Sequence, residues 1–230
     1  LGLNAVGVLR VLGLGSYQTG CAMLHRLLRA MIRPGRERLH GVVEVDECIV
    51  GLSPPLSIRD TKKKQKLTAK RKAQLSIVVV AVEIKQPKGF GRIRLQRVTD
   101  KSEKAVLPFV LDAVEPGSVV RTDGSAAYRK LEKHGYQRDK TVQLGAEDPA
   151  HVTMPGVHRV AALLKRWLLG THQGAVRPEQ LDYYLDEFVF RFNRRTSRSR
   201  GLLFYRMLEQ ALVTEPVTYA QITRKAKHNI

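Results

Sequence analysis

One short segment, residues 42–51, limits what this chain can fold into more than any other. Its sequence, VVEVDECIVG, alternates like a half-buried β-strand and is rich in Val and Ile, which favour strands. Asp46 lies in its middle, with Glu44 on the same side of the strand and Glu47 on the other. Burying an ionised carboxylate without a partner is costly. Either a metal ion binds here or the acids lie along a solvated sheet edge, and the segment alone leaves both interpretations open.

The charge of the chain indicates the class of partner. There are 40 Lys and Arg residues against 21 Asp and Glu, a formal net charge of +19. Such an excess indicates a polyanion, most often nucleic acid. A purely binding protein, such as a ribosomal protein, would show the same sign. Composition therefore predicts the partner and leaves the activity open.

Several simple features bear on location. Charged residues interrupt every apolar run well before the roughly 20 residues of a membrane helix. Residues 1–14 are apolar but lack the charged start and cleavage site of a signal peptide. Cys21 and Cys48 are too few for a zinc site or a disulfide framework, which fits a reducing cytosol. We expect a cytoplasmic protein with no membrane partner, and the lack of an initiator Met suggests a fragment.

Hydrophobic periodicity predicts a mixed α/β protein. With 43% hydrophobic residues, the chain can bury a substantial core. Strands are expected at 42–51, 74–84, 90–98, 118–122 and 140–144, and helices in the second half of 1–40 and at 101–113, 125–133, 157–169, 178–193 and 199–212. Hairpin strands followed by helix-connected strands fit a mixed five-stranded sheet flanked by helices.

The same pattern suggests a division of the chain. We expect an N-terminal helical segment over residues 1–40, one large α/β domain over 41–213 and a C-terminal tail over 214–230. Residues 53–73 form a Pro-rich and then Lys-rich loop that is too polar to pack. A solvated insertion is favoured over a specific DNA clamp, although its lysines could still attract phosphates.

A second acid, Asp123, directly follows the expected strand 118–122. Ligands of α/β sheets gather beyond the carboxyl ends of strands, but Asp-Gly after a strand is also an ordinary turn. Asp46 and Asp123 on neighbouring strands could share a metal ion. Two carboxylates ~4 Å apart repel by roughly 4 kcal/mol at an effective dielectric near 20. Protonation or a divalent cation would relieve this repulsion, and oxygen ligands suit Mg²⁺ or Mn²⁺.

The expected helix 157–169 supplies two further candidates. His158 and Lys165 are seven residues apart, which places them on one face two turns along the helix. A lone His near a helix start is more often a surface residue than a ligand. Neither residue indicates a site without the two aspartates.

Four blocks carry a family resemblance: VEVDE at 43–47, RTDG at 121–124, LLKRWLLGTH at 163–172 and YLDEFVFRFNRR at 184–195. The last two are long enough to be specific. With these blocks the chain resembles DDE-class transposases of bacterial insertion sequences (the ISXO-like group) over roughly residues 5–212. The resemblance implies an RNase H-like core that cuts and joins DNA strands by phosphoryl transfer.

The resemblance also implies roles for particular residues. Asp46, Asp123 and His158 take the places of the ligands of two divalent ions, Mg²⁺ or Mn²⁺. Lys165 takes the place of a contact to a phosphate near the scissile bond. Further DNA contacts are expected from Arg166, Arg194 and Arg195. The implied partners are insertion-sequence ends and target DNA, with at least a dimer formed on DNA.

The chain departs from the family pattern in several ways. Most of the class has Glu where this sequence has His158, a neutral and softer ligand that favours Mn²⁺ over Mg²⁺. Cys48 and a single Gly51 stand where relatives show an aromatic residue or Thr and paired glycines, and the Lys-rich insertion is unusual. The zinc ribbon found ahead of many relatives is absent here. Three functions remain open: a transposase, an RNase H-like nuclease that cuts without joining, and an inactive DNA-binding remnant.

Overall fold

A computed structural model describes residues 4–32, 35–51, 75–85, 87–140, 153–172, 176–215 and 218. The chain divides into two compact units, one of residues 38–178 and one of residues 1–37 together with 179–230. The sequence-based division at residues 40 and 213 remains a prediction. The Lys-rich loop at 53–73 lies outside the described residues.

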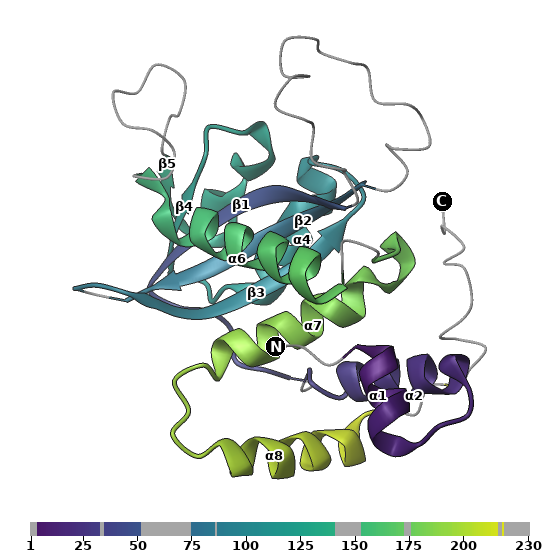
Figure 1. Ribbon diagram of the computed structural model, residues 1–230. Helices are drawn as coiled ribbons and strands as arrows, with labels where there is room; N and C mark the ends of the chain where they lie inside the picture. The colour runs from purple at the N-terminus through teal and green to yellow at the C-terminus, as the bar shows by residue number, and fades with distance from the viewer. Residues whose placement is uncertain are drawn as a thin grey trace. The chain divides into compact units, whose positions relative to one another are not determined.

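A five-stranded mixed sheet forms the centre of the first unit, in the order β3-β2-β1-β4-β5 (Figure 1). The strands are β1 Val42–Gly51, β2 Leu75–Ile84, β3 Phe90–Val98, β4 Val119–Thr122 and β5 Gln137–Lys140. The first three pair antiparallel, whereas β4 is parallel to β1 and β5 is parallel to β4. The expected mixed five-stranded sheet is confirmed, and β1 is its central strand rather than an edge.

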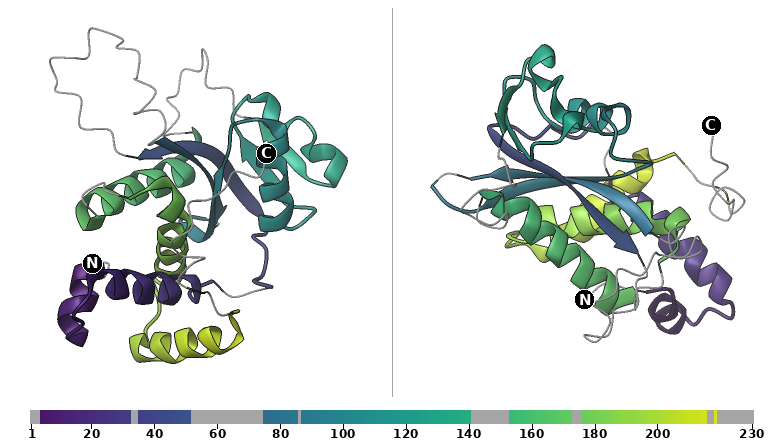
Figure 2. Two further views of the ribbon diagram at one scale, coloured as in Figure 1. Left: turned by 90° about the vertical axis from the view of Figure 1, so that its right-hand side faces the viewer. Right: turned by 90° about the horizontal axis from the view of Figure 1, so that it is seen from above.

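Helices cover the two faces of this sheet (Figure 2). One face carries α4 (Glu103–Ala113) and the other carries α6 (Pro155–His172). Alternate residues of a strand point to opposite faces. Val43 and Val45 are therefore buried in the core beneath α4, whereas Glu44 and Asp46 face α6. The alternation of β1 thus places Glu44 and Asp46 on the face opposite Val43 and Val45.

One expected helix of this unit differs in the structure, and one strand was not expected. Residues 125–133 were expected to form one helix but contain two short 3₁₀ helices, η2 Ala126–Tyr128 and η3 Leu131–His134. Tyr128 and Leu131 are both fully buried three residues apart, which is the 3₁₀ period. A strand that the sequence did not predict lies at 137–140, whereas the strand expected at 140–144 falls, except for Lys140, outside the described residues. The strand at 137–140 is a polar edge strand, bonded to β4 through its backbone, so apolar alternation could not locate it.

The second unit is helical. Its helices are α1 Ala5–Leu12, α2 Tyr17–Arg29, α7 Leu181–Asn193 and α8 Arg200–Val213. The helices expected near 23–31, 178–193 and 199–212 are confirmed, with the 3₁₀ helix η4 (Pro178–Gln180) preceding α7. His25 of α2 is buried and stacks on Tyr183 of α7 with ring centroids 4.8 Å apart. Among the described helices, none combines the length and apolarity needed to cross a membrane.

Candidate functional site

A cleft lies between β1 and α6 in the first unit. Asp46, Cys48, His158 and Lys165 are among the residues that line it. β1 contributes the first two and α6 contributes the others. The sheet and the helix therefore bring Asp46 together with His158 and Lys165, which lie more than 100 positions later in the chain.

Asp46 is half-buried, and its Oδ1 accepts a hydrogen bond of 2.7 Å from the backbone N–H of Glu47. The pKa of Asp46 is raised from 3.8 to about 6, chiefly by burial and also by the negative charges of Glu47 and Asp123. The hydrogen bond from Glu47 and the charge of Lys101 oppose this shift. Asp46 thus lies where an added positive charge would stabilise its ionised form.

Asp123 lies next to Asp46 in the register of the sheet. Val45 of β1 pairs with Thr122, the last residue of β4, and the two aspartates are the residues that follow. The Oδ1 atom of Asp123 also accepts a hydrogen bond of 2.9 Å from the N–H of Ser125. The turn interpretation and the paired-carboxylate interpretation of Asp123 are therefore compatible.

His158 lies in the first turns of α6 and is half-buried. Its Nε2 atom is buried and has no hydrogen-bond partner within the described part of the chain. A buried polar atom without a partner is unfavourable, and an imidazole nitrogen is a common metal ligand. Nevertheless, no group of three His, Cys, Asp or Glu side chains in the described residues is placed to hold one ion.

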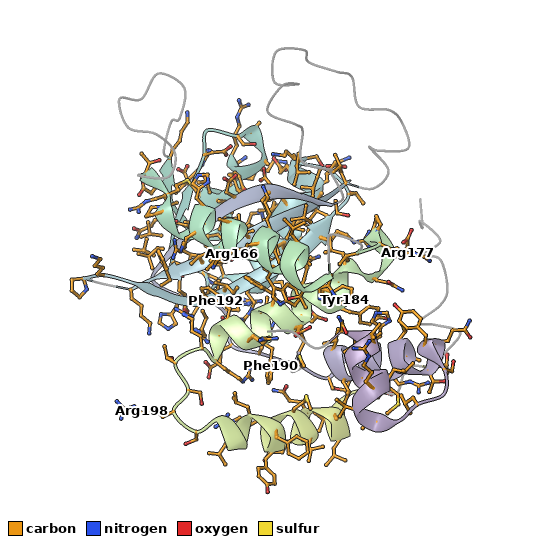
Figure 3. The ribbon with its side chains drawn as sticks, viewed as in Figure 1. Arg166, Arg177, Tyr184, Phe190, Phe192 and Arg198 are labelled. Atoms are coloured by element: carbon orange, nitrogen blue, oxygen red, sulfur yellow. The ribbon has the colours of Figure 1, made fainter. Side chains whose placement is uncertain are left out.

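Two basic residues of α6 follow His158. Lys165 is exposed and lines the same cleft, as expected from its spacing of two helical turns. Arg166 is also exposed and projects from α6 (Figure 3), but it is not among the residues that line the cleft. The two neighbours therefore offer their charges in different directions, as adjacent helical residues do.

Arg194 and Arg195 belong to the helical unit, at the end of α7. The guanidinium of Arg194 lies 3.9 Å from the ring centroid of Phe190, and that of Arg195 lies 4.0 Å from the ring centroid of Phe192. Both phenylalanines project from α7 (Figure 3). Arg195 also donates a 2.8 Å hydrogen bond to the carbonyl of Phe192. These contacts hold two planar cations along the helix, a form suited to phosphate recognition.

Two acids beside Asp46 have contacts that their sequence positions did not predict. The Oε1 atom of Glu47 accepts a hydrogen bond from the Tyr128 hydroxyl, and its Oε2 lies 3.5 Å from Nζ of Lys101. Glu44 binds the start of α6 through its Oε2 atom. The sequence indicated only that Glu44 and Glu47 belong to the same strand as Asp46. It could not identify their partners, which lie far away in the chain.

Cys48 lines the cleft but does not have the character of a metal ligand. Burial raises the pKa of its thiol to about 11, so the thiol is neutral at physiological pH. Cys48 and Cys21 are both free cysteines. The carboxylates of the two aspartates and the imidazole of His158 therefore remain the candidate metal ligands.

Comparisons with known proteins agree with the resemblance in the sequence. Residues 38–193 match the ISXO2-like transposase domain, which is more than half of the chain. Among solved structures, the chain is similar to the catalytic core domain of BIV integrase at 14% identity and a TM-score of 0.40, covering 73% of this chain and 93% of that one. No curated protein matches the sequence. The chain belongs to the ISXO2-like transposase family.

Proposed function

We propose that this protein is a transposase that cuts DNA and joins the strands by metal-dependent phosphoryl transfer. Family membership supports a transposase core that acts on DNA. The observation that carries the finer proposal is the cleft lined by Asp46, His158 and Lys165, with Asp123 next to Asp46 in the sheet. This set provides acidic and imidazole ligands together with a cation for a phosphate.

The donor groups fit a pair of divalent ions. The carboxylates of Asp46 and Asp123 would hold Mg²⁺ or Mn²⁺, and His158 would complete the set with its buried, unpartnered Nε2. Bound ions of this kind supply activation of the attacking hydroxyl and stabilisation of the leaving oxygen. The protein's own part would be to hold Asp46 on β1 and His158 on α6 at the cleft, with Asp123 directly after β4.

The basic residues would bind and orient the DNA. Lys165 would contact a phosphate beside the ligands, because it is exposed and lines the same cleft. Arg166, Arg194 and Arg195 would add backbone contacts, and the net charge of +19 would strengthen them at low salt. The proposed partners are the insertion-sequence ends and target DNA in the cytoplasm, bound by a dimer or larger assembly.

Strand transfer with the element's own ends tests this proposal. Asp46→Ala and Asp123→Ala should each abolish cleavage and joining in Mn²⁺ while DNA affinity stays within about threefold of the wild type. Asp112→Ala, at an exposed position of α4, is the matched control and should retain activity. Wild-type activity in either of the first two variants would refute the metal assignment.

An inactive DNA-binding remnant is the second candidate. One observation favours it: among the described residues, no three His, Cys, Asp or Glu side chains lie close enough together to hold one metal ion. Titration of Mn²⁺ and Mg²⁺ against labelled ends separates the candidates, because a remnant would bind without metal-dependent cleavage. Cleavage without joining of a 3′-hydroxyl end would instead indicate a nuclease.

A further inference from the structure

Glu44 is a fully buried acid to which the proposed reaction assigns no role. It lies on β1 two residues before Asp46, and its relative exposure is 0%. A buried carboxylate persists in a fold when specific partners compensate for its lost hydration. The partners of Glu44 therefore indicate what it does.

One carboxylate oxygen of Glu44 binds the first turn of α6. Its Oε2 accepts hydrogen bonds from the backbone N–H of Gly156 at 2.7 Å and of Val157 at 3.0 Å. The N–H groups of a first turn have no acceptor within their own helix, and a negative charge at this end is favourable. A side chain of the central strand thus caps a helix that starts more than 100 residues later in the chain.

The close approach of α6 to Glu44 requires glycine at position 156. A Cβ atom there would lie 2.8 Å from Oε2 of Glu44 and 2.8 Å from Cδ1 of Ile84. Such distances force the helix or its neighbours to shift. Among the residues that the structure describes, no atom lies within 4 Å of a Cβ added at Gly170, near the other end of α6. The two glycines of one helix therefore form a matched pair for a test.

The other oxygen of Glu44 points toward β4. Its Oε1 lies 3.7 Å from Nη1 of Arg121, and Arg121 is itself held by a 2.9 Å hydrogen bond from its Nε to Oδ2 of Asp139 on β5. Glu44 consequently joins the central strand, the neighbouring strand and the start of α6. His158 is the second residue after Gly156, so the cap and the candidate ligand share one helical turn.

We propose that Glu44 is a positioning residue, which fixes the start of α6 so that His158 and Lys165 face Asp46 across the cleft. The inference rests on the proposed function and deepens it, because it assigns the alignment of the site to a residue outside the ligand set. Misplacement of a reacting group by about 1 Å can lower a rate by roughly 100-fold. A small displacement of the first turn should thus reduce turnover while DNA binding persists.

Three variants test this role at a temperature where circular dichroism shows each to be folded. Glu44→Met removes both acceptors, Glu44→Gln keeps one, and Gly156→Ala displaces the helix while the carboxylate remains. We expect kcat for Mn²⁺-dependent cleavage to fall by about 100-fold, about tenfold and at least tenfold respectively. DNA affinity should stay within about threefold, and the control Gly170→Ala should match the wild type in both measurements. Partial rescue by Gln distinguishes the hydrogen bonds from mere filling of space.

Hydrogen exchange gives a readout that does not depend on activity. In Glu44→Met the amides of Gly156 and Val157 should exchange at least tenfold faster than in the wild type, while those in the last turns of α6 should not change. Faster exchange with unchanged kcat would show a helix cap without a positioning role and overturn the proposal, as would unchanged exchange. If the wild type itself fails to cleave DNA, the proposed function fails. The exchange rates of the Gly156 and Val157 amides in Glu44→Met would still decide whether Glu44 fixes the start of α6. If Glu44→Met does not fold, the exchange rates in Gly156→Ala serve instead.

Discussion

Replacing Asp46 with asparagine should stabilise the metal-free protein and abolish its catalysis at the same time. Burial, together with the charges of Glu47 and Asp123, raises the pKa of Asp46 from 3.8 to about 6. Each pKa unit corresponds to about 1.4 kcal/mol, so ionised Asp46 costs the folded state at most about 3 kcal/mol above pH 7. Asparagine removes that charge and keeps an acceptor for the N–H of Glu47.

The net gain should be smaller than this limit. The added amide NH₂ group needs a partner of its own, and a buried group without one costs about 1 to 2 kcal/mol. We therefore expect Asp46→Asn to raise the free energy of unfolding by roughly 1 to 2 kcal/mol at pH 8 in EDTA, measured by urea denaturation. Asp112→Asn, at an exposed position of α4, should change it by less than about 0.5 kcal/mol.

The pH dependence of the free energy of unfolding tests whether ionised Asp46 destabilises the folded state. A folded-state pKa above the unfolded value means that the folded protein binds the proton more tightly. The contribution of protonated Asp46 to the stability of the wild type should thus be lost as pH rises from about 4 to about 6, so the stability of the variant relative to the wild type should increase over that range. At pH 4 and below the two should converge, apart from the uncharged amide contacts. Parallel pH profiles, or an Asp46→Asn protein less stable at pH 8, would refute the electrostatic argument.

The remaining predictions concern single side chains of the first unit. Lys165→Ala should reduce cleavage by about 10- to 100-fold and leave the free energy of unfolding unchanged, because Lys165 is exposed. In a plot of the logarithm of the DNA-binding constant against the logarithm of salt concentration, the same variant should lower the slope by about one. Tyr128→Phe removes the buried hydroxyl that donates to Glu47 and should cost about 1 to 3 kcal/mol in urea denaturation. His158→Glu supplies a harder, charged ligand and should raise activity in Mg²⁺ relative to Mn²⁺ by about tenfold, measured in parallel cleavage assays.

Most of the sheet was predictable because the hydrophobic pattern of each long strand can be recognised from the strand's own sequence. β2 and β3 follow one another with runs of Val and Ile or with alternation, and a short Pro-Lys-Gly link joins them. β5 was not predicted, because its sequence, QRDK, has no apolar residue and its place depends on pairing with β4. The salt bridge between Arg121 and Asp139 that accompanies this pairing links residues 18 positions apart. Local periodicity carries no signal for such an edge strand.

The candidate site was predictable in part for the same reason. The spacing of His158 and Lys165 is local to one helix, and the structure places both in the cleft with Asp46. The pairing of Asp46 with Asp123 needed the strand order, which the resemblance supplied, and the structure shows β1 and β4 as neighbours up to Val45 and Thr122. Their joint action as metal ligands stays a prediction, because it depends on distances that a sequence does not contain.

The three acids of β1 show why an acid in an apolar strand does not identify a ligand by itself. The strand period sends Glu47 to the face of Tyr128 and sends Glu44 and Asp46 to the face of α6. Glu47 is compensated by a hydroxyl and an amine, and Glu44 by two helical amides, so both have partners within the protein. Asp46 receives one backbone hydrogen bond among the described contacts and has two negative neighbours. Compensation is incomplete for Glu44 as well, because its Oε1 is buried without a hydrogen-bond partner in the described part of the chain and burial raises its pKa. What singles out Asp46 is therefore its two negative neighbours together with its place in the cleft beside His158 and Lys165, where a bound cation would contribute most.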